Sequence, residues 1–188
     1  MKFIVVLLTV LNCTVLIYAQ QECLTPPNMA DPRQCCAIPH TTSHREVFAK
    51  CMQKHPIPMV AAPAGGPPPG ANCLAECVLE EQGLLSNGII SKDVALSHLL
   101  AEVGSSADWQ TVARNSVEAC YSQVSALGTQ KDANGCSSIA GAFMECLPTT
   151  LFKKCPTSSW TASPECEQQK AHLEKGCSLM SLIKKPGM

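Results

Sequence analysis

Apolar side chains recur at helical spacing over much of the chain, and no segment shows the strict alternation of a half-buried strand. Helix signals bound these apolar stretches. Asn72, Ser91 and Ser106 are good N-cap residues, Gly83 is a natural stop, and Pro148 should break a helix. The pattern predicts an all-α fold. The expected helices are 44–54, 73–82, 92–103, 107–126, 136–147 and 164–176.

The first nineteen residues have the features of a secretory signal peptide. Lys2 is followed by an apolar run from Ile4 to Tyr18 and then by the small residue Ala19. The run is shorter than the roughly 20 apolar residues that a spanning helix needs, and Asn12 interrupts it. We therefore expect cleavage after Ala19, a secreted protein and no stable membrane insertion.

Charge and motifs exclude several classes of function. The formal net charge is −1 and no basic run is present, so nucleic acid is not an expected partner. The chain lacks a Gly-x-Ser-x-Gly elbow, a His-Glu-x-x-His pair and a glycine-rich phosphate loop. We predict neither an enzyme nor a bound cofactor.

Cysteine is the unusual component, with thirteen residues. Cys13 lies in the predicted leader, which leaves an even number, so an exported chain should form six disulfides. Zinc is the rival interpretation, but Cys73 with Cys77 and His172 with Cys177 are only fragments of a zinc motif. Cys73 and Cys77 stand four apart on a predicted helix and point to the same side, so each should bond a different partner.

The cysteine spacing resembles that of insect odorant-binding proteins. Cys73-x3-Cys77 is followed by Val-Leu-Glu-Glu-Gln-Gly-Leu-Leu, and 42 residues separate Cys77 from Cys120. The surplus cysteines resemble the Plus-C subgroup of that family. The subgroup features are the adjacent Cys35-Cys36 before Ile38-Pro39, and Cys155-Pro156 with nine further residues before Cys166.

The resemblance implies a pairing for six of the twelve cysteines. The family order joins Cys51 to Cys77, Cys73 to Cys136, and Cys120 to Cys146. The other six allow fifteen pairings, which stay open, and we expect them to tie the N-terminal arm and the C-terminal tail onto the core. These six are Cys23, Cys35, Cys36, Cys155, Cys166 and Cys177.

The resemblance also implies an organisation and a function. Residues 1–19 would be the signal peptide, 20–43 an arm, 44–147 the odorant-binding-protein-like core and 148–188 a Plus-C-type extension. About six helices would enclose an apolar cavity that disulfides hold open. The protein would carry odorants, pheromones or other semiochemicals through aqueous lymph, with an olfactory receptor as a further partner.

The apolar helix faces supply the expected cavity wall, although each residue taken alone could be ordinary core packing. The expected wall residues are Val78, Leu85, Leu96, Leu99, Leu100, Trp109, Val112, Val117, Val124, Ile139, Phe143 and Met144.

Two alternatives stay open. The exposed loop Pro63–Gly70 would suit a secreted interaction protein, such as a protease inhibitor or toxin-like factor. His98 could make ligand release depend on pH, or it could be an ordinary exposed histidine.

Overall fold

The computed structural model describes Cys23 and residues 31–39, 42–57 and 68–182, so the expected signal peptide lies outside the described residues. Seven helices and one small hairpin fill these stretches, which confirms the all-α expectation. The helices are α2 (Pro32–Cys35), α3 (Thr42–Lys54), α4 (Ala71–Glu81), α5 (Lys92–Val103), α6 (Ala107–Ser125), α7 (Ser138–Lys153) and α8 (Pro164–Glu174), with short 3-10 turns η1 (Thr157–Ser159) and η2 (Leu179–Leu182).

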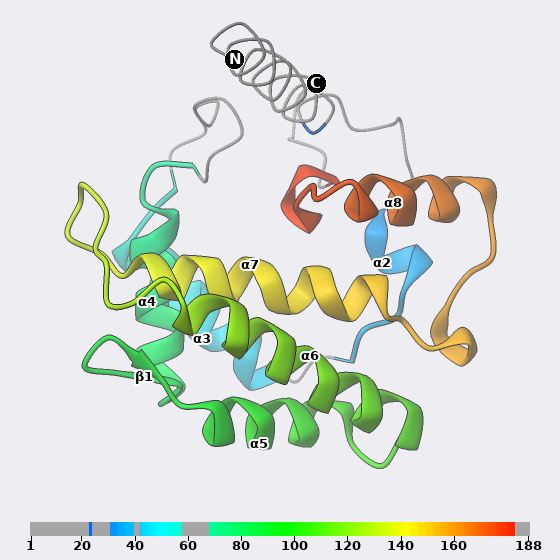
Figure 1. Ribbon diagram of the computed structural model, residues 1–188, viewed down its shortest axis with the longest axis horizontal. Coiled ribbons are helices and arrows are strands. Elements are labelled where there is room, and N and C mark those ends of the chain that lie inside the picture. The colour runs from blue at the N-terminus through cyan, green and yellow to red at the C-terminus, as the bar shows by residue number, and fades with distance from the viewer. Residues whose placement is uncertain (1–22, 24–30, 40–41, 58–67, 183–188) are drawn as a thin grey trace, which may run out of the picture.

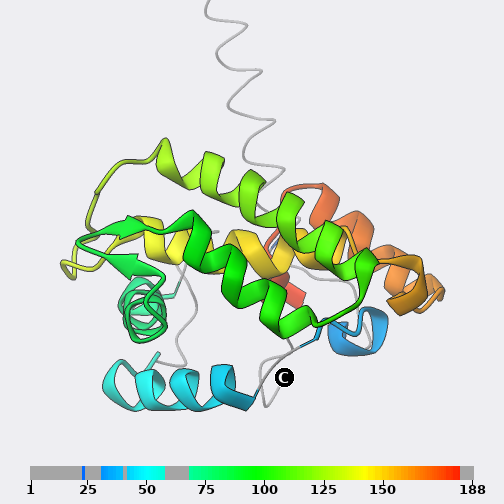
Figure 2. The same cartoon turned by 90° about the horizontal axis from the view of Figure 1, so that it is seen from below.

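Helix α7 is the centre of the bundle (Figure 1). Helices α4, α6 and α8 all contact it, whereas α5 packs on α6 and α3 packs on α4. Seen from below, α3 forms an outer layer beneath α4 (Figure 2). In the described parts of the chain, no helix is both long and apolar enough to cross a bilayer.

The predicted end of the fifth helix at Pro148 is wrong. Helix α7 continues through Pro148 to Lys153. A proline inside a helix removes one backbone hydrogen bond and strains the preceding turn. Leu151 and Phe152 lie beyond it and are 4% and 1% exposed, so their burial offsets that loss.

The predicted caps of α5 and α6 are present, but that of α4 is not. The hydroxyl groups of Ser91, Ser106 and Ser163 each accept a hydrogen bond from the first turn of α5, α6 and α8. Helix α4 instead begins after Gly70, which adopts a left-handed φ of 82°. Asn72 lies inside the helix, and its Nδ2 donates to Asp132 Oδ2 over 3.0 Å.

A short hairpin with a two-residue turn follows α4, in a stretch where no strand alternation is visible in the sequence. Strand β1 (Leu85–Ser86) pairs antiparallel with β2 (Ile89–Ile90). The turn residues Asn87 and Gly88 have φ values of 52° and 73°. Asn-Gly is the preferred pair for a tight hairpin turn with positive φ at both positions, and this signal was missed.

The three disulfides implied by the family resemblance are present. Cys77 bonds Cys51 of α3, and Cys73 bonds Cys136 just before α7, so α4 is joined to two different neighbours as expected. The remaining three bonds each join the N-terminal arm to the C-terminal segment. These bonds are Cys23–Cys177, Cys35–Cys166 and Cys36–Cys155, and they span 154, 131 and 119 residues of sequence.

Candidate ligand-binding site

Most of the twelve expected wall residues are in the protein interior. Four are half-buried, namely Leu96, Leu100, Val112 and Met144. The eight buried residues are each less than 7% exposed. These are Val78, Leu85, Leu99, Trp109, Val117, Val124, Ile139 and Phe143.

Eleven of the twelve residues converge on one apolar cluster, the main core. They come from β1, α5, α6 and α7, so residues far apart in sequence meet around the central helix. Val78 is the exception, because it lies in a smaller cluster with Cys51, Leu74 and Cys77 between α3 and α4. Met144 contacts both clusters and connects them. Eleven of the predicted residues therefore pack together in the bundle around α7.

Trp109 lies in the main core and has one polar contact. Its ring is 3% exposed, and Nε1 donates a hydrogen bond to Ser159 Oγ over 3.0 Å. Ser159 belongs to the turn η1 that follows α7. A buried indole N–H needs such a partner, so Trp109 joins the first turn of α6 to the C-terminal segment.

Sequence reasoning missed the contribution of the C-terminal segment to the core. Leu151, Phe152, Leu173 and Leu182 are all buried in the main core. Phe152 also meets Trp160 edge to face, with ring centroids 5.5 Å apart. The signal was Leu151, which stands eight residues after Phe143 and four after Leu147 and so continues their helical stripe, and the assumed break at Pro148 concealed it.

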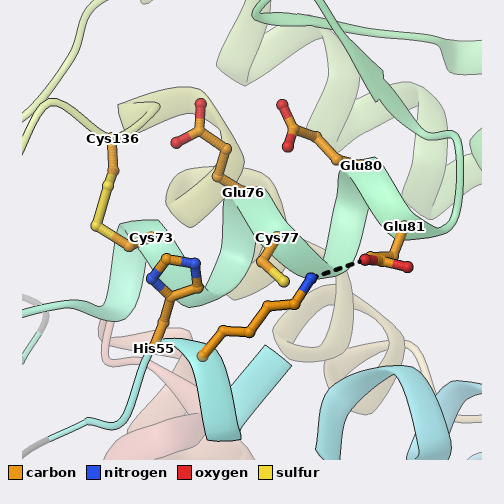
Figure 3. Close-up of a pocket in the computed structure, with 8 residues that line it drawn as sticks. His55, Cys73, Glu76, Cys77, Glu80, Glu81 and Cys136 are labelled. Carbon is orange, nitrogen blue, oxygen red and sulfur yellow. Dashed lines mark hydrogen bonds and ion pairs between the residues drawn. A yellow bond between two sulfur atoms is a disulfide. The ribbon is translucent and has the colours of Figure 1, made fainter. Parts of the chain in front are cut away.

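One hollow lies on the surface, away from the main core. It measures about 490 Å³ and opens beside α4 (Figure 3). A second hollow of about 330 Å³ adjoins it and shares Lys54, His55 and Cys73. None of the twelve expected wall residues lines either one. The larger hollow is lined by Lys54, His55, Cys73, Glu76, Cys77, Glu80, Glu81 and Cys136.

The charged groups of this hollow make it unsuitable for an apolar guest. Glu81 pairs with Lys50 at 2.7 Å and with Lys54 at 3.1 Å. The hydrogen bond from Lys50 and then that from Lys54 lower the pKa of Glu81 below its ordinary value. Glu76 Oε2 accepts from the backbone N–H of Ser137 over 3.2 Å. An apolar molecule here would displace water from the carboxylates without replacing its hydrogen bonds. The apolar interior is therefore the better candidate for the ligand site.

No metal-binding arrangement supports the rival zinc interpretation in the described ranges. Those residues contain no group of three or more His, Cys, Asp or Glu side chains placed to hold an ion. Cys73, Cys77 and Cys177 are consumed by disulfides. His172 is buried on α8, and its Nε2 lies 3.0 Å from Ser181 Oγ. The three cysteines of the zinc interpretation therefore act as disulfide crosslinks.

The helical bundle and three of its disulfides, Cys51–Cys77, Cys73–Cys136 and Cys120–Cys146, fit the pattern of insect odorant-binding proteins. The family model described as AgamOBP47-like matches residues 45–172, so the chain belongs to this family, whose members are carriers and not enzymes. The three disulfides beyond the common three are consistent with the Plus-C subgroup, as the cysteine spacing indicated.

Two mosquito proteins are similar to the chain over most of its length. General odorant-binding protein 67 of Anopheles gambiae is 30% identical over 160 residues, which cover 82% of this chain and 78% of that protein. Odorant-binding protein 47 of Anopheles gambiae is 25% identical over 178 residues, covering 85% of this chain and 75% of that protein. Family membership and the many disulfides indicate an exported protein.

Proposed function

We propose that the chain is a secreted carrier that takes up small hydrophobic molecules within its helical bundle. The cargo would be odorants, pheromones or other semiochemicals, carried through aqueous lymph to receptors. The observation that supports this most is the convergence of eleven predicted wall residues on one interior cluster in a chain of this family.

The disulfides supply the stability that an internal guest site requires. An interior with room for a ligand forfeits close packing, which is costly in a domain of this size. Each disulfide contributes about 2–4 kcal/mol, mainly by restricting the unfolded chain. The three bonds that join the arm to the C-terminal segment close the longest loops, and they brace the end of α7 and α8.

Burial of apolar surface would be the main driving force for binding. Removing apolar surface from water contributes about 25 cal/mol per Å². A ligand that buries about 300 Å² gains about 7.5 kcal/mol, close to the value for a micromolar Kd before the cost of association is subtracted. The carrier would therefore bind a range of similar molecules in the micromolar range or weaker.

Tryptophan fluorescence tests the interior site directly. Trp109 is buried within the main core, whereas Trp160 is half-buried at its C-terminal edge and its Nε1 donates to Glu167. In a Trp160→Phe variant, saturating decanol should quench or shift the emission of Trp109. The matched Trp109→Phe variant, which retains Trp160, should respond much less.

Displacement of the fluorescent apolar probe N-phenyl-naphthylamine provides the second readout. Displacement by decanol supports the carrier function. Absence of probe binding together with an unchanged Trp109 signal would overturn it. Inhibition of a protease in the same preparation would then favour the alternative of a secreted interaction protein, whose expected loop lies mostly outside the described residues.

A further inference from the structure

One buried hydroxyl on α6 has no hydrogen-bond partner among the described residues. Ser116 on α6 is 0% exposed, and its Oγ makes no hydrogen bond within the described structure. A buried polar group without a partner is destabilising, and alanine would fit the same space without that cost. The presence of a hydroxyl at this position therefore needs an explanation.

Other hydroxyl groups on the same helix are satisfied in the ordinary way. Thr111 Oγ1 donates to the carbonyl of Ala107 over 3.0 Å, and Ser125 Oγ donates to that of Tyr121 over 2.7 Å. This bond to the carbonyl four residues earlier is the usual solution for Ser and Thr within helices. Ser116 does not adopt it, so its hydroxyl remains available to a group outside the helix.

Ser116 lies on the side of α6 that faces α7. Trp109 and Cys120 stand seven and four residues away, which places all three within a narrow stripe along the helix. Cys120 is bonded to Cys146 of α7, and Trp109 donates to Ser159 just beyond α7. Ser116 lies between these two contacts, about 10 Å along the axis from Trp109 and about 6 Å from Cys120.

We propose that Ser116 is the polar contact of the ligand site, binding the single oxygen of an otherwise apolar alcohol, aldehyde or ketone between α6 and α7. This inference rests on the proposed carrier function. The surrounding stripe is apolar, so the hydroxyl is the group that can distinguish an oxygenated ligand from a hydrocarbon. A hydroxyl both donates and accepts, so it suits a ligand hydroxyl group as well as a carbonyl oxygen.

The test compares decanol, decanal and decane as competitors of N-phenyl-naphthylamine in the full mature protein. Ser116→Ala should weaken decanol and decanal by about 3- to 10-fold and leave decane and the probe unchanged. Ser125→Ala is the matched control, because it removes a hydroxyl from the same helix at an exposed position that already has its bond. It should change none of the four affinities.

A thermal melt without ligand provides an independent readout. Removing an unpartnered buried hydroxyl should raise the Tm of Ser116→Ala by about 2–4 °C. An unchanged or lower Tm would mean that the hydroxyl is satisfied within the protein, and would overturn the inference. Equal affinities of wild type and Ser116→Ala for decanol would also overturn it while leaving the carrier function intact. If the wild-type protein binds no probe, the carrier function and the inference fail together.

Discussion

Gly141 allows α7 to approach the start of α4 closely, and its replacement by alanine should destabilise the protein. A Cβ at this position would overlap Asn72 Oδ1 and come within 2.9 Å of Asn72 Cγ. The Asn72 side chain is not free to move away, because it donates to Asp132. Gly141→Ala therefore introduces a steric conflict at the contact between two helices that the Cys73–Cys136 bond also holds together.

The magnitude follows from two opposing effects. Alanine is favoured over glycine in a helix interior by about 1 kcal/mol. Overpacking a well-packed contact costs about 1–3 kcal/mol. The expected net result is a loss of up to about 2 kcal/mol in the free energy of unfolding, although helix propensity alone predicts a gain.

A double-mutant cycle with Asn72→Ala separates the two effects. The Asn72→Ala change removes the conflicting atoms, and the nearest backbone atom, Asn72 Cα, is then 3.6 Å from the new Cβ. Asn72→Ala alone should cost about 1 kcal/mol for the lost bond to Asp132. The double variant should be more stable than the sum of the single changes by about 1–3 kcal/mol.

Equilibrium unfolding in guanidinium chloride, followed by circular dichroism with the disulfides intact, measures all four proteins. A Gly141→Ala variant about 1 kcal/mol more stable than the wild type, as expected for an open helix, would rule out the steric conflict with Asn72. Additive effects of the two substitutions would equally contradict a contact between these residues.

Three further predictions concern charge, crosslinks and pH. The hydrogen bond from the backbone N–H of Cys136 is the main cause of the lowered pKa of Asp132. The ionised Asp132 therefore stabilises the fold above its ordinary pKa, and this stabilisation is lost as the pH falls below about 4. The Tm of wild type should fall more steeply in acid than that of Asp132→Asn, and parallel acid curves would contradict this. Replacing both Cys35 and Cys166 by alanine should lower the free energy of unfolding by about 2–4 kcal/mol, measured by denaturant titration, because it frees α8 from the arm; an unchanged midpoint would show that this bond is redundant. His98 is exposed on α5, so His98→Gln should bind decanol as tightly as the wild type does at about pH 5 and at about pH 7. If the wild-type affinity depended on pH and that of His98→Gln did not, His98 would be identified as the group that controls ligand release.

The cysteine pattern carried most of the information about this fold. Helical periodicity located six helices, and the family spacing implied three disulfides that the structure contains. The pairing of Cys35 with Cys166 and of Cys36 with Cys155 was out of reach, because adjacent cysteines give no local preference between partners more than a hundred residues away.

Local rules failed where tertiary contacts overrode them. Pro148 reads locally as a helix end, but burial of Leu151 and Phe152 extends α7 beyond it. Asn72 reads as a cap, but its side chain contacts Asp132 across the bundle, sixty residues away in sequence.

The apolar faces that pack into the main core could be predicted, because helical spacing is visible in the sequence. The unusual position of Ser116 among them could not, since a serine on a helix ordinarily bonds the preceding turn. Only its burial and missing partner in three dimensions distinguish it from Ser125.

Photolabelling with an aliphatic alcohol that carries a diazirine would show where a bound ligand lies in solution. After irradiation and peptide mapping, an interior site should give adducts on α6 and α7, within 109–124 and 139–152, that an excess of decanol suppresses. Decanol-sensitive adducts confined to the surface hollow around Lys54, Glu76 and Glu80 would contradict an interior site.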